Sequence, residues 1–183
     1  MTSFSTKGVT ESGGKYIPYG IQEITITGVS AKEVGDGTST PAIFVDFKEL
    51  KGEKILNIRF AFSEKATKYS LRKIKHILTK VITPMEVEAF DGKDFKTVTE
   101  MATALNTVLS NRPLRVKFQA EEVASRDAGS RPWKKAILGF PPFAEALSVN
   151  PTQLVFDNAK DIKLLGATLT PTPQRQGVGD LPF

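Results

Sequence analysis

Five stretches of the chain alternate apolar and polar residues, and no other feature limits the possible folds as strongly. β-branched and aromatic residues dominate these stretches, which is typical of β-strands. The predicted strands are residues 20–31, 42–50, 54–62, 113–119 and 133–140. Alternation with a period of two gives each strand one apolar face. Five short strands of this kind must bury those faces together in one core.

Helical periodicity fills the region between the third and fourth predicted strands. Ser63 is expected to cap a helix that ends near Ile82, because Pro84 prevents simple continuation. One side of this helix is mainly apolar and consists of Ser70, Ile74, Ile77, Leu78 and Val81. The far side carries a basic stripe of Lys65, Lys68, Arg72 and Lys75, for which a solvated helix face is favoured over a binding surface. A capping-box spacing from Thr97 to Glu100 predicts a second helix, and residues 84–96 are expected to be a connector.

Three strands, helical material and two further strands follow one another in the order of a known architecture. This order predicts a mainly β, α+β fold, a five-stranded OB-type Greek-key barrel with a helical insertion between strands three and four. Closing the barrel would bury the apolar faces and leave few free strand edges. The alternative is another small α+β fold with an antiparallel sheet, because the pairing order of strands is not visible in a sequence.

The two ends of the chain differ from this central part in composition. Residues 20–147 are expected to form the domain, and residues 1–19 form an arm rich in glycine, serine and threonine. Residues 143–147 favour a helical turn, and residues 148–165 give only weak signals for an extension. Residues 166–183 hold three prolines and three glycines with few apolar anchors, which predicts a disordered tail.

Several classes of function are disfavoured by the residues that the chain lacks. It has no cysteine, which excludes disulfides, thiolate zinc sites and cysteine nucleophiles. Its single histidine, His76, argues against histidine metal sites and Ser-His-Asp chemistry, and we expect it to be a surface residue of the helix. No apolar run is long enough to span a membrane, and the N-terminus does not resemble a secretory signal. The absence of cysteine also fits the reducing cytoplasm, where we expect the protein to act.

One acidic cluster is the only candidate for metal-dependent catalysis. It consists of Glu86, Glu88, Asp91 and Asp94. Carboxylates can hold Mg²⁺, so a metal-dependent nuclease is one hypothesis. The four residues fit no calcium-loop spacing and lie in one connector, which favours a solvated acidic loop. We therefore expect no enzymatic activity, no cofactor and no metal.

The positive charge of the chain is concentrated in two blocks. The net charge is +5, but residues 51–80 hold nine basic and two acidic residues, and residues 111–135 hold seven and three. Residues 81–110, between the blocks, are acidic overall. If folding brings the basic blocks together, they form a surface suited to a polyanion. The alternative is that these lysines and arginines only solvate helix and strand faces.

An OB-type barrel predicts where such a surface would lie. Oligonucleotides bind these barrels on strands two and three and on the loops that join strands one to two and four to five. Candidate stacking groups for bases are Tyr16, Tyr19, Phe44 and Trp133. Candidate polar partners for the strand are Lys48, Asn57, Arg59, Arg126, Arg131, Lys134 and Lys135. The alternatives are that Phe44 packs beneath a helix or the N-terminal arm, and that Trp133 caps one end of the barrel.

The last four residues, Asp180, Leu181, Pro182 and Phe183, carry a resemblance to a known family. Bacterial and bacteriophage single-stranded DNA-binding proteins end in acidic residues followed by a similar apolar tip. The helix start Ser63-Glu64-Lys65-Ala66 and the strand start Arg131-Pro132-Trp133-Lys134 are similar to phage members, over roughly residues 20–140. The tip here departs from the family in having one acidic residue, Asp180, preceded by Gly177-Val178-Gly179.

This resemblance implies a protein that coats single-stranded DNA without strong sequence preference, in the cytoplasm of a bacterium or, if a phage encodes it, of the host. In the family, a rigid OB domain binds the strand, and the terminal tip recruits proteins of replication, recombination and repair. The implied partners are therefore single-stranded DNA and, through Asp180–Phe183, such proteins, with a possible homo-oligomer and no membrane. The alternative is a structural or assembly interaction protein, for example of a phage, whose tail docks a partner and whose basic face is incidental.

Overall fold

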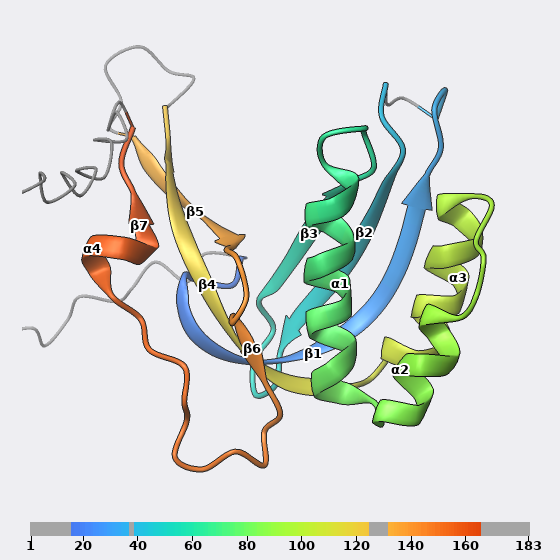
Figure 1. Ribbon diagram of the computed structural model, residues 1–183. Coiled ribbons are helices and arrows are strands. Elements are labelled where there is room, and N and C mark those ends of the chain that lie inside the picture. Colours follow the sequence, from blue (N-terminus) through green and yellow to red (C-terminus); the bar gives the residue numbers. More distant parts are fainter. Residues whose placement is uncertain (1–15, 37–38, 125–131, 166–183) are drawn as a thin grey trace, which may run out of the picture.

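β1 (Gly20–Lys32) is the strand that joins the two halves of the sheet. The structure, a computed structural model, describes residues 16–36, 39–124 and 132–165. Residues 20–25 of β1 pair with one neighbouring strand and residues 24–32 pair with another, both antiparallel. The register slips between Ile26 and Gly28, and such a bulge bends a strand. Figure 1 shows β1 curving from one half of the sheet to the other.

The strand order of the sheet is β3-β2-β1-β4-β5. The bounds of the other principal strands are β2 (Ala42–Glu49), β3 (Ile55–Ala61), β4 (Pro113–Val123) and β5 (Trp133–Leu138). Two short strands, β6 (Ala144–Glu145) and β7 (Ile162–Lys163), also pair with β4, the second of them in parallel. The protein is thus a mixed α+β protein with a largely antiparallel sheet, and the predicted positions of the five longer strands are confirmed.

The expected closed barrel is wrong, because the sheet stays open between its two outer strands. Within the described residues, β3 pairs with β2 and β5 pairs with β4, but β3 and β5 do not pair with each other. Groups from other segments form hydrogen bonds with the outer edges of β3 and β5 instead. The backbone N–H of Ile17 donates to the carbonyl of Ile55 at 3.1 Å, and Lys73 donates to the carbonyl of Leu138 at 2.8 Å. A helix and the segment before β1 therefore lie where a closing ladder of hydrogen bonds would run.

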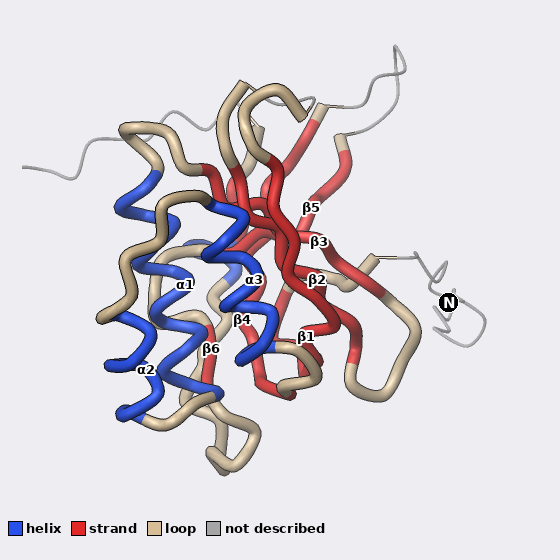
Figure 2. The backbone as a smooth tube through the Cα atoms, turned by 90° about the vertical axis from the view of Figure 1, so that its right-hand side faces the viewer, coloured by secondary structure: helices blue, strands red, loops and turns tan. Residues whose placement is uncertain are grey.

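Three helices lie between β3 and β4 in the chain, and Figure 2 shows them on one side of the sheet. α1 (Thr67–Val81) buries Ser70, Ile74, Ile77 and Leu78, which confirms the predicted apolar face. Its start differs from the prediction, because Ser63 lies in a turn before the helix. The Ser63 hydroxyl accepts from the N–H of Ala66 at 3.2 Å, and its carbonyl accepts from the N–H of Thr67 at 2.9 Å.

The expected connector at residues 84–96 is wrong over its first half, which is the helix α2 (Pro84–Asp91). Thr83 and Glu86 form a capping box, each side chain accepting from the backbone N–H of the other, and Pro84 occupies the first helical position. α3 (Val98–Leu109) begins where predicted, with Thr97 accepting from the N–H of Glu100 at 3.1 Å. None of the described helices is long and apolar enough to cross a membrane.

The core fills the space between the curved sheet and the helices. Phe47 of β2 and Phe118 of β4 are fully buried and meet edge to face, with ring centroids 5.9 Å apart. Ile77 of α1 and Leu105 of α3 are buried in the same cluster. Both halves of the sheet and two helices thus share one core, which holds β3 and β5 in place although they do not pair.

The segment of residues 144–165 begins and ends against β4, through β6 and β7, and two buried carboxylates hold it there. The helical turn expected at residues 143–147 is wrong, since Ala144 and Glu145 form β6. Glu145 pairs with Arg115 at 2.6 Å. Further along, Asp161 is the last residue of the short helix α4 (Asn158–Asp161) and pairs with Lys117 at 3.2 Å. These contacts fix the segment between β5 and the C-terminal residues.

His76 is not the plain surface residue that was expected. Its Nε2 accepts from the backbone N–H groups of Phe143 and Ala144, at 3.3 and 3.2 Å. Its ring also meets that of Phe143 edge to face, with centroids 4.8 Å apart. His76 therefore joins α1 to the start of β6.

Candidate nucleic-acid interface

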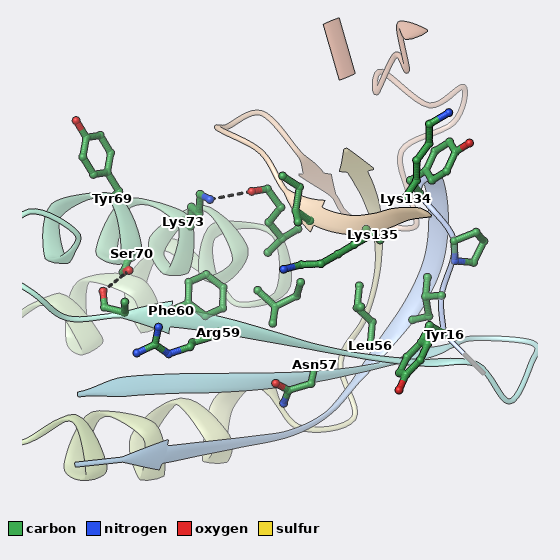
Figure 3. Close-up of a pocket in the computed structure, with 18 of the residues that line it drawn as sticks. Tyr16, Leu56, Asn57, Arg59, Phe60, Tyr69, Ser70, Lys73, Lys134 and Lys135 are labelled. Carbon is green, nitrogen blue, oxygen red and sulfur yellow. Dashed lines mark hydrogen bonds between the residues drawn. The ribbon is translucent and has the colours of Figure 1, made fainter. Parts of the chain in front are cut away.

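A groove of about 770 Å³ occupies the opening between β3 and β5. β3 and β5 form two of its walls, α1 contributes a third, and the segment before β1, residues 16–19, closes one end (Figure 3). Most of its lining is apolar, including Leu56, Ile58 and Ala136. The groove exists because the two outer strands of the sheet remain apart.

The charged side chains among the described residues that line the groove are all cations. They are Arg59, Lys73, Lys134 and Lys135. Figure 3 shows Lys135 pointing from β5 into the space above β3. Arg59 donates to the carbonyl of Thr40 at 3.4 Å. Four positive charges without a carboxylate in the same lining favour an anionic ligand.

Acidic residues do approach these lysines from the neighbouring strand. Glu121 and Glu122 of β4 are the register partners of Lys135 and Lys134. Within the described part of the chain, neither lysine forms an ion pair with them. Glu122 instead accepts from the backbone N–H of Leu165 at 3.0 Å. The two lysines are exposed and available to an incoming anion.

Exposed aromatic rings surround part of the groove. Tyr16 is 67% exposed and Trp133 is 53% exposed, and both line the end near residues 16–19. Tyr19 also lines this end, where its ring stacks on that of Phe156 with centroids 6.0 Å apart. Exposed rings next to cations are the combination that stacking on bases requires.

The groove brings together most of the residues that the sequence indicated. Those that line it are Tyr16, Tyr19, Asn57, Arg59, Trp133, Lys134 and Lys135. Phe44 and Lys48 of β2 do not line it. Phe44 is the register partner of Arg59, and its ring lies 6.0 Å from Nζ of Lys32. Lys48 pairs with Glu53 at 2.9 Å. Arg126, Arg131 and Asp180–Phe183 lie outside the described residues.

Three residues at the α1 end of the groove were not predicted from the sequence. Tyr69 and Lys73 of α1 line the groove, and Phe140, which follows β5, meets Tyr69 edge to face with centroids 5.8 Å apart. Nζ of Lys73 lies 5.7 Å from the centre of the Phe140 ring. The available signal was Tyr69 itself, an aromatic ring on the exposed, mainly cationic side of a helix.

Lys73 is the most enclosed of the groove cations. Its ammonium group donates to the carbonyl of Leu138 at 2.8 Å, which ties α1 to the end of β5. Burial lowers the pKa of Lys73 from its ordinary value, and the nearby charge of Lys163 lowers it further. In the described part of the chain, Lys73 has no carboxylate partner. An anion bound here would stabilise its charged form.

Comparisons with known proteins place the chain in no family. A scan against protein-family models found no match, and a search of the curated proteins found none either.

Within residues 16–36, 39–124 and 132–165, no three histidine, aspartate or glutamate side chains come close enough to hold a metal ion. The four acidic residues from Glu86 to Asp94 do not converge, since Thr83 engages Glu86 and Lys75 pairs with Asp91 at 2.5 Å.

Proposed function

We propose that the protein binds single-stranded DNA in the groove between β3 and β5. One observation carries the proposal: the described lining combines four cations, no carboxylate and several exposed aromatic rings. Lysine and arginine bind phosphates of any sequence, and aromatic rings stack on any base. The protein would therefore coat a single strand with little sequence preference.

The nature of the groove favours a single strand over a duplex. Stacking on a protein ring requires an unpaired base whose face is accessible, and a duplex hides those faces inside its own stack. Each stacked base contributes roughly 1–3 kcal/mol of binding free energy, so two or three rings give useful affinity. Cations that neutralise phosphates release counterions, so binding should weaken steeply as salt rises.

We further propose that the sheet is an OB-type barrel opened between β3 and β5. The support lies in the five longer strands, in which β1 pairs with both β2 and β4, and in the helices inserted between β3 and β4. Opening the barrel at this point would turn two strand edges into walls of the binding groove.

A fluorescence titration tests the proposed binding directly, because Trp133 is the single tryptophan of the chain. Oligo(dT) of about 12 nucleotides should quench Trp133 at low salt, and if each of the four groove cations neutralises one phosphate, affinity should fall roughly 50-fold between about 50 and 200 mM salt. A duplex of the same length should bind much more weakly. Absence of any oligo(dT) binding at low salt would contradict the proposal.

We also propose that the tip Asp180–Phe183 recruits partner proteins of replication, recombination or repair. The support is the resemblance of the tip, in which an apolar ring can enter a pocket while Asp180 and the terminal carboxylate meet basic groups. Deleting residues 177–183 should leave oligo(dT) affinity unchanged and abolish capture of such partners. Loss of oligo(dT) binding on deletion would contradict the division of roles.

A second candidate function is the docking of an extended peptide. It is favoured by the outer edges of β3 and β5, which the described residues leave largely unpaired along the groove. An extended peptide can pair with such edges, and the lysines would select an acidic one. If this candidate is right, an acidic peptide should quench Trp133 in the same titration, and oligo(dT) should not.

A further inference from the structure

Tyr69, Lys73 and Phe140 form a compact group at the α1 end of the groove. Tyr69 is 53% exposed and Phe140 is 63% exposed, so much of each ring remains accessible although the two rings meet edge to face. The ammonium group of Lys73 lies over the Phe140 ring and donates to the carbonyl of Leu138 at the end of β5. We propose that these three residues are a second nucleotide-binding subsite, distinct from the end formed by Trp133 and Tyr16. This inference rests on the proposed function.

The two ends of the groove are separated by the length of β5. Trp133 is the first residue of β5, and Leu138, which Lys73 contacts, is the last. Five steps at about 3.3 Å each place the two ends about 17 Å apart. A stacked strand advances about 3.4 Å per nucleotide, so about five nucleotides span this distance. A single strand running along β5 would therefore stack on rings at both ends.

The charge around Lys73 favours a phosphate at this end. The ammonium group has three donors, and the carbonyl of Leu138 takes one of them. The charge of Lys163 is close enough to lower the pKa of Lys73, and neither lysine has a carboxylate partner in the described residues. A phosphate between base-stacking rings would offset this concentration of positive charge, whereas a neutral ligand would not.

Moving the single tryptophan tests whether this end meets a base. In the full chain, the double variant Trp133→Phe/Tyr69→Trp keeps a ring at each position and places the reporter at the α1 end. Saturating oligo(dT) of about 12 nucleotides, with binding followed by anisotropy of a labelled strand, should quench this tryptophan. Bound oligo(dT) with unchanged tryptophan emission overturns the subsite. If the double variant does not fold, Trp133→Phe/Phe140→Trp gives the same measurement.

Affinity measurements on the natural chain provide the matched comparison. Tyr69→Ala should weaken binding of the same oligo(dT) about tenfold. Tyr69→Phe keeps the ring and should bind oligo(dT) with the affinity of the unaltered protein. The control Leu71→Ala changes an exposed residue of α1 outside the groove and should have no effect. Equal affinities of the Tyr69→Ala variant and the unaltered protein overturn the subsite but leave the proposed function intact. If the unaltered protein binds no oligo(dT), the proposed function itself fails.

Discussion

Arg115 of β4 and Glu145 of β6 form a buried ion pair, with Nη1 of the arginine 2.6 Å from Oε1 of the glutamate. The same guanidinium donates to Glu23 of β1 at 3.1 Å and to the carbonyl of Val149 at 3.0 Å. The second oxygen of Glu145 accepts from the N–H of Gln153 at 2.9 Å. One carboxylate thus fixes the chain that follows β5 against the centre of the sheet.

Glu145→Gln should destabilise the fold by about 2 kcal/mol, because it removes the buried carboxylate charge to which Arg115 donates and leaves that half-buried guanidinium with Glu23 as its remaining charged partner. The free energy of unfolding, measured by urea denaturation at neutral pH, checks this expectation. The control is Glu23→Gln, which removes the more exposed partner of Arg115 and should cost less than about 1 kcal/mol. Equal losses of unfolding free energy in the two variants would show that burial of Glu145 adds little to the stability of the fold.

Asp161 should make the fold sensitive to acid. Burial alone would raise the pKa of Asp161, but hydrogen bonds from the N–H of Asp157, from Gln119 and from Lys117 outweigh it and lower the pKa below its usual value. The stabilisation is present above the pKa of an unfolded aspartate, about 3.9, and is lost as pH falls below it. Asp161→Asn should flatten the acid side of the stability profile. The same slope in both proteins would contradict this role.

His76 should add a second pH dependence nearer to neutrality. Burial and the nearby charge of Lys80 lower the pKa of His76, and its neutral ring accepts from the N–H groups of Phe143 and Ala144. Because the folded pKa lies below the unfolded value of about 6.5, stability is complete above that pH and decreases below it. His76→Gln keeps an acceptor but does not titrate, so its unfolding free energy should change less between pH about 7.5 and 5.5. An unchanged profile would exclude His76 as the cause.

Strand positions could be predicted from the sequence, but the opening of the sheet could not. Alternation of apolar residues is a local signal, and it located all five longer strands. Barrel closure depends on contacts between distant residues, and here Lys73 of α1 reaches Leu138 of β5 across 65 positions of the chain. α2 is different, because the spacing of Thr83 and Glu86 is a local capping signal that the prediction of a connector overlooked.

The same distinction applies to the candidate site. Trp133, Lys134 and Lys135 could be proposed because they begin a predicted strand next to a polar loop. The position of Tyr69 on α1 was predictable, but the strand end facing it was not, so its contact with Phe140 was missed. Helical periodicity tells which side of a helix is exposed, and it does not tell which other element shares that side.

Trp133 and Phe44 should contribute very differently to binding if the strand lies in the groove. Trp133→Ala should lower oligo(dT) affinity by about 1–3 kcal/mol through loss of one stacked base. Phe44→Ala should have little effect, because Phe44 does not line the groove. Anisotropy titrations of both variants, with thermal unfolding to confirm folding, check this. A loss for Phe44→Ala as large as for Trp133→Ala would place the strand on the outer face of β2 instead.

Lys134 and Lys135 should set the salt dependence of binding. Each phosphate neutralised on a single strand contributes about 0.7 to the slope of log affinity against log salt concentration. The double variant Lys134→Gln/Lys135→Gln should therefore reduce that slope by about 1.4. The control is Lys68→Gln/Arg72→Gln, which removes two cations from the exposed side of α1, outside the groove, and should leave the slope unchanged. A control that lowers the slope equally would mean that the strand responds to the charge of the whole protein rather than to the cations between β3 and β5.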